Sequence, residues 1–145
     1  MKVFDSQSCS FNPRADMFLP DWLNVFGVFL DALALVTLGA AIVFGVYSAI
    51  ILSLLLGAFG IAAYLCWKNQ KINIIDENTF EYTTFLGKKT IYKFSDIKKM
   101  RANSDSYTLF VGEGKVHIES CARISKELLD KIDVALKLNH IVSEL

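Results

Sequence analysis

The sequence predicts an α+β membrane protein, with a transmembrane α-helical hairpin followed by antiparallel strands and a C-terminal capping helix. A long uncharged segment in the first half predicts the hairpin. Short apolar–polar alternations after Trp67, separated by turn residues, predict the strands. Of the 145 residues, 53% are apolar, and the mean hydropathy is +0.39, which is high for a soluble protein.

The uncharged segment is too long for one span. No charged residue occurs from Ala32 to Trp67, a run of 36 positions. As one helix it would measure about 54 Å, whereas the hydrocarbon core of a bilayer is about 30 Å thick. Glycine, tyrosine and serine coincide around Tyr47 and predict a break there. We therefore predict helices at Trp22–Phe44 and Ser48–Trp67; a shorter first span after an interfacial helix is the alternative.

Small residues recur every fourth position on both predicted helices, a spacing that lets membrane helices approach closely. A hairpin folded at Tyr47 would place these positions opposite one another. Chance is the alternative, since small residues are common in membrane helices. The candidate packing pairs are Gly45 with Ala49, Ala41 with Ser53, and Thr37 with Gly57.

Asp31 is the one acidic residue well inside the first predicted helix. A carboxylate at the centre of a span costs about 3 kcal/mol on the insertion scale. The same register places Asp31 beside Tyr64, so we predict an intramembrane polar site at these two residues. One interpretation is a proton relay in a transport assembly. The other, which we favour, is a carboxylate near the headgroups that is satisfied by Tyr64, water or another subunit.

The flanking charges predict the orientation. The hairpin tip is uncharged, whereas Arg14 precedes the first helix and Lys68 and Lys71 follow the second. Because basic residues stay on the cytoplasmic side, we expect a multi-pass protein of the plasma membrane with both termini in the cytoplasm. The predicted parts are a polar N-terminal segment (1–21), the hairpin (22–67) and a cytoplasmic domain (68–145).

The second half predicts six strands and a helix. Ser125 can cap the helix, with Ile124 and Leu129 as its hydrophobic staple, and an apolar stripe runs through Leu128 and Ile132. The domain is therefore expected to be a compact bent sheet closed by one helix. The expected strands are residues 71–75, 79–85, 90–94, 97–102, 107–111 and 115–119.

The second half contains four short motifs: Ile74-Ile75-Asp76, Phe80-Glu81-Tyr82, Phe85-Leu86-Gly87-Lys88-Lys89 and Tyr92-Lys93-Phe94-Ser95-Asp96-Ile97. This series resembles that of the bacterial pleckstrin-homology-like (PH-like) domains, and a preceding two-helix hairpin is a recurring layout in small bacterial membrane proteins. The resemblance covers residues 68–145 in pattern and implies an antiparallel β-barrel or sandwich with a C-terminal capping helix.

No sequence motif indicates catalysis. The chain lacks G-x-S-x-G, H-E-x-x-H, C-x-x-C and phosphate-binding glycine loops, and its two histidines stand apart from other metal-ligand residues. We expect no enzyme activity, cofactor or metal site. Residues 68–145 hold 13 basic and 11 acidic residues, a net charge of +2 (13 − 11), which argues against nucleic-acid binding.

Binding is the expected function. The first hypothesis is a membrane-anchored adaptor that binds a protein partner or its own copies. The alternative is recognition of anionic lipid headgroups through Lys88, Lys89 and Lys93. PH-like domains that bind phosphoinositides concentrate basic residues at the first hairpin, but here that turn is the acidic segment 76–78. A solvated strand face is the remaining interpretation of the lysines, because alternation spreads their side chains over two faces.

Overall fold

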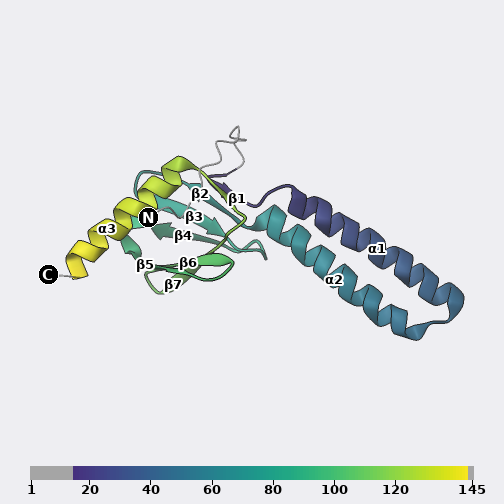
Figure 1. Cartoon of the computed structure of the whole chain (residues 1–145). Helices are drawn as coiled ribbons and strands as arrows, with labels where there is room; N and C mark the ends of the chain where they lie inside the picture. The colour runs from purple at the N-terminus through teal and green to yellow at the C-terminus, as the bar shows by residue number, and fades with distance from the viewer. Residues whose placement is uncertain (1–14, 144–145) are drawn as a thin grey trace.

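The computed structural model describes residues 15–143, with side chains through residue 139. Two long helices, α1 (Trp22–Phe44) and α2 (Tyr47–Asn69), contact each other along an arm that projects from a domain of two antiparallel sheets. A third helix, α3 (Lys126–Ser143), packs on those sheets at the side away from the arm (Figure 1). The predicted α+β architecture is confirmed at this level. Residues 1–14 of the predicted N-terminal segment, Arg14 included, lie outside the described residues.

The turn between the two long helices contains only Gly45 and Val46. Gly45 has φ +67°, and its N–H donates to the carbonyl of Ala41. A glycine in the left-handed conformation is a common way to end a helix, because it satisfies a carbonyl of the last turn without a Cβ penalty. The first predicted helix has the bounds of α1, and α2 begins one residue before and ends two residues after the second.

The strands form two sheets. In the first, the order is β4-β3-β2-β1-β8, and in the second it is β5-β6-β7. A short 3-10 helix, η1 (Phe94–Asp96), connects the sheets. The first sheet contains β1 (Met17–Phe18), β2 (Lys71–Ile74), β3 (Thr79–Thr83), β4 (Lys89–Lys93) and β8 (Arg123–Ile124); the second contains β5 (Ile97–Ala102), β6 (Ser106–Val111) and β7 (Gly114–Glu119).

The six predicted strands correspond to β2 through β7, but the sequence analysis predicted neither β1 nor β8. β1 lies before the helical arm and pairs with β2, which follows it, while β8 pairs with the other edge of β1. The sheet of the domain therefore includes residues on both sides of the arm. An antiparallel helical hairpin returns the chain to its starting point, so the residues that flank it become neighbours.

The side chain of Asp16 ties β1 to the rest of the domain. Its carboxylate accepts hydrogen bonds from the backbone N–H of Ile74 (2.7 Å) and the hydroxyl of Ser125 (3.2 Å). Ser125 also caps α3, because its hydroxyl accepts from the N–H of Leu128 (3.2 Å), which confirms the predicted cap.

The core lies between the sheets and α3. Leu128, Ile132 and Ala135 are buried, so the apolar stripe of α3 faces the sheets. α3 covers one end of the domain, and the arm leaves from the other (Figure 1). The sheets contribute Met17, Ile72, Phe80, Tyr82, Phe94, Ile97, Leu109, Val111, Val116 and Ile118.

Candidate functional site

The two helices of the arm are long and apolar enough to cross a membrane. Only 17% and 11% of their most apolar segments are buried inside the protein. Large apolar side chains such as Phe29, Leu35 and Phe59 are exposed along their length. A helix in the core of a soluble domain would instead bury these side chains against other elements.

The contact between α1 and α2 follows a seven-residue repeat. Gly27, Ala34 and Ala41 are buried on α1, and Ser53 and Gly60 are buried on α2. The Ser53 hydroxyl donates to the carbonyl of Ala34 (2.7 Å), and a Cβ at Gly60 would lie 2.8 Å from the carbonyl oxygen of Gly27. Such a repeat is typical of two helices packed along a narrow seam.

This register differs from the mirror pairs expected from the sequence. Ser53 contacts Ala34 rather than Ala41. A Cβ at Gly57 would likewise lie 3.7 Å from the Cβ of Ala34 and would meet no atom of Thr37 within 4 Å. The cause is the turn, which is centred between Gly45 and Val46 instead of at Tyr47.

The six candidate packing residues therefore have different surroundings. Ala41 and Ser53 are buried, whereas Ala49 and Gly57 are partly buried. Thr37 donates its hydroxyl to carbonyls of its own helix, and Gly45 is exposed in the turn.

Asp31 lies against Gly60. A Cβ at Gly60 would clash with the carboxylate oxygen Oδ1 of Asp31. Among the described residues, the carboxylate of Asp31 has no hydrogen-bond or ion-pair partner. Tyr64 lies one turn further along α2, where its ring contacts Trp67 (centroids 5.9 Å apart) and Lys68 (5.7 Å). The structure therefore places Asp31 and Tyr64 on successive turns of the interface and does not bring them together as a pair.

Hydrogen bonds order the region where the arm joins the domain. The indole N–H of Trp67 donates to the Asp21 carboxylate (3.1 Å), which joins the end of α2 to the start of α1. The buried side chain of Gln70 donates to the carbonyl of His117 on β7 (3.2 Å). The Tyr82 hydroxyl donates to the same carbonyl (3.4 Å), and burial raises the pKa of Tyr82.

The basic residues predicted as one patch are spread along β4. Lys88 and Lys89 lie at its start, and Lys93 lies at its end, about 13 Å away by strand rise. Lys89 forms an ion pair with Glu81 (3.1 Å). Lys88 and Lys93 are exposed and form no ion pair with a described residue.

A cleft of about 460 Å³ lies between β4 and the turn that joins β6 to β7. No sequence pattern predicted this cleft, because its walls come from segments about twenty residues apart. Tyr92 and Gly114 meet in its lining, where a Cβ at Gly114 would lie 2.5 Å from the Tyr92 hydroxyl. The lining residues are Thr79, Ile91, Tyr92, Lys93, Asp96, Val111, Gly112, Glu113 and Gly114.

The backbone of β4 is available on the side of this cleft. β4 is the edge strand of its sheet and pairs only with β3. The N–H of Phe94 donates to Asn78 (2.9 Å) and that of Thr84 to Lys88 (2.9 Å), so the even-numbered residues of β4 exchange hydrogen bonds with β3. The backbone N–H and C=O groups of successive residues in an antiparallel strand point alternately toward and away from the neighbouring strand. Those of Ile91 and Lys93 therefore point away from β3.

No group of three or more metal-ligand side chains occurs within the described part of the chain. Comparisons with protein-family models, curated proteins and solved structures found no match to this chain.

Proposed function

We propose that this chain is a membrane-anchored binding module whose PH-like domain docks an extended protein segment on the free edge of β4. The arm of α1 and α2 is the anchor, and the domain lies in the cytoplasm. The anchor is supported by the exposed apolar side chains of both helices and by Trp22, Trp67 and Lys68 at the end that joins the domain, since tryptophan and basic residues favour the membrane interface.

The free edge of β4 is the observation that carries the docking proposal. Unpaired backbone groups on an edge strand are a template for an added strand, and neighbouring pockets select its side chains. Here the outward-facing backbone groups of Ile91 and Lys93 border the cleft. Lys93, Asp96 and Glu113 provide charges of both signs around it.

A photo-crosslinking residue placed in the full-length chain tests the docking site in native membranes. At Ile91, which is 63% exposed beside the cleft, we expect a discrete crosslinked product. The matched control is Leu138, which is 60% exposed on α3. A product at twice the mass of the chain would identify a second copy as the ligand. Equal crosslinking from Ile91 and from Leu138 would contradict the proposed docking site at β4.

The contribution of the β4 backbone to docking is tested by comparing Ile91→Pro with Ile91→Ala. Both substitutions remove the isoleucine side chain, but only proline removes the outward N–H. Proline is tolerated at a position where an edge strand directs its N–H away from the sheet. We expect crosslinking from a probe at Glu113 to persist in Ile91→Ala and to be lost in Ile91→Pro, with both variants folded by circular dichroism. Equal crosslinking in the two variants would exclude strand addition at β4.

A further inference from the structure

The turn between β3 and β4 presents two apolar side chains to the outside. Phe85 and Leu86 are 45% and 71% exposed at the tip of this turn. The turn is tight, because the N–H of Gly87 donates to the carbonyl of Thr84 (2.8 Å) and Gly87 has φ +84°. A well-ordered turn that exposes two large apolar side chains together indicates a contact surface.

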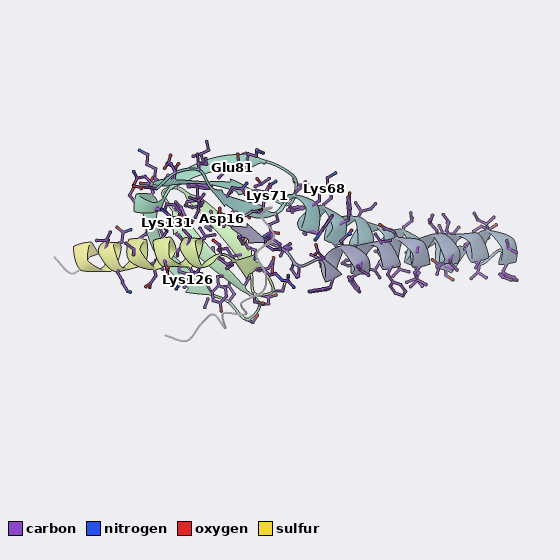
Figure 2. All side chains as sticks on the ribbon, turned by 90° about the horizontal axis from the view of Figure 1, so that it is seen from above. Asp16, Lys68, Lys71, Glu81, Lys126 and Lys131 are labelled. Carbon is purple, nitrogen blue, oxygen red and sulfur yellow. The ribbon has the colours of Figure 1, made fainter. Side chains whose placement is uncertain are left out.

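The position of this turn identifies what it contacts. The side-chain amide of Asn69, the last residue of α2, donates to the carbonyl of Phe85 (2.8 Å). The turn therefore lies at the end of the arm, in the layer that holds Trp67 and Lys68. Figure 2 shows Lys68 and Lys71 at this junction, whereas Lys131 on α3 lies farther from the arm.

The turn at the opposite end of the same strands contains acidic residues. β3 spans about 13 Å, and the turn that precedes it contains Asp76 and Glu77. Lys131 of α3 donates to the carbonyl of Glu77 (3.1 Å), which places that turn at the end covered by α3. The β3–β4 turn nearest the arm therefore exposes two apolar side chains beside Lys88, whereas the β2–β3 turn farthest from the arm contains two carboxylates.

The charges at the near end are available to an anionic partner. Lys68 and Lys88 are exposed, Lys71 is partly exposed, and none of the three forms an ion pair within residues 15–139. These lysines lie beside exposed apolar residues and at the level of an interfacial tryptophan. Their positive charge is complementary to the anionic headgroups of a leaflet, and the apolar side chains are suited to its hydrocarbon.

From this geometry we propose that Phe85 and Leu86 insert into the leaflet that the arm enters, with Lys68 and Lys88 on its anionic headgroups. The inference rests on the proposed membrane anchor but is independent of docking on β4. It assigns lipid contact to the turn and to Lys88, and it excludes Lys93, which lies at the far end of β4. The β4 cleft then remains open to the cytoplasm.

Electron paramagnetic resonance on full-length, singly spin-labelled chains in lipid nanodiscs tests the insertion. The native cysteines are replaced by serine, and the lipid is a mixture of phosphatidylcholine and phosphatidylglycerol. A label at Leu86→Cys is expected to collide preferentially with oxygen, as lipid-exposed sites do. A label at Ile75→Cys, which is 52% exposed at the opposite turn, is expected to collide preferentially with a water-soluble nickel complex.

A label at Leu35→Cys on α1 separates failure of this inference from failure of the anchor. If the Leu35 label is lipid-exposed and the Leu86 label is water-exposed, the turn does not insert and this inference is overturned while the anchor stands. If the Leu35 label is itself water-exposed, both the membrane anchor and the insertion of the turn are overturned.

The headgroup contact is tested in the same nanodiscs with the Leu86 label. Lys88→Glu is expected to move the label toward water, and so is omission of phosphatidylglycerol. Lys93→Glu, the matched control on the same strand, is expected to leave its depth unchanged. Equal shifts from Lys88→Glu and Lys93→Glu, or no shift from Lys88→Glu and from the lipid change, would overturn the headgroup assignment.

Discussion

The carboxylate of Asp31 on α1 lies so close to Gly60 on α2 that a Cβ at Gly60 would clash with it. Gly27 lies against the same residue, since a Cβ at Gly27 would lie 2.9 Å from the carbonyl oxygen of Gly60. The two glycines therefore make room both for the helix contact and for the carboxylate. This arrangement determines which substitutions the arm tolerates.

Gly60→Ala is expected to weaken the arm, because its methyl group would clash with Asp31. Forcing an extra carbon into a packed contact typically costs 1–3 kcal/mol, and we expect a loss of about that size. The measurement is the free energy of unfolding in mixed detergent micelles. Gly39→Ala is the matched control, since a Cβ there meets nothing within 4 Å. The double variant with Asp31→Ala should recover part of the loss, and no recovery would show that the carboxylate is not the obstacle.

Asp16→Ala is expected to destabilise the domain although its position precedes the arm. The substitution leaves the N–H of Ile74 without its acceptor and removes the bond from Ser125. A lost hydrogen bond to a charged group in a partly buried site should cost about 1–3 kcal/mol. Thermal unfolding of the full chain measures the effect. Asp130→Ala, at an exposed position of α3, serves as control, and equal melting temperatures for the two variants would contradict the role of Asp16.

The turn between β2 and β3 is expected to lose stability in acid. The hydroxyl of Thr79 and the N–H of Asn78 donate to the Asp76 carboxylate, which lowers the pKa of Asp76 below its ordinary value of 3.8. Because the folded-state pKa is the lower one, the stabilisation is fully present above pH 3.8 and is lost as the pH falls through the folded pKa. Carbon-detected NMR titration of the Asp76 carboxyl measures its folded-state pKa. Thr79→Val should raise this pKa, and an unchanged value would contradict the assigned cause.

The two helices of the arm, the strands β2 through β7 and α3 were predictable because each has a clear period or a clear boundary. The uncharged run predicted the arm, and alternation with turn residues predicted β2 through β7. β1 was missed because two residues are too short to show alternation. Its pairing with β2 follows instead from the arm, which brings Phe18 opposite Lys71.

The candidate sites were less predictable, because they depend on where the chain turns. The short turn at Gly45 shifted the helix register, so Gly60 rather than Tyr64 lies against Asp31. The direction of β4 separated Lys93 from Lys88, although they are close in sequence. The sequence did contain an indication of the contact surface at Phe85, because two apolar residues before Gly87 are unusual for a solvated turn. Only the hydrogen bond from Asn69 shows that this turn lies at the end of the arm.

Labelling with a membrane-impermeant maleimide tests the central claim most directly, that a membrane-spanning arm holds the domain in the cytoplasm. Cysteine is placed at Tyr47 in the tip of the arm or at Glu113 in the domain, in a cysteine-free full-length chain expressed in intact cells. The account predicts that Tyr47→Cys is labelled in intact cells and that Glu113→Cys is labelled only after the membrane is permeabilised. Labelling of Glu113→Cys in intact cells, or protection of both positions until permeabilisation, would contradict it.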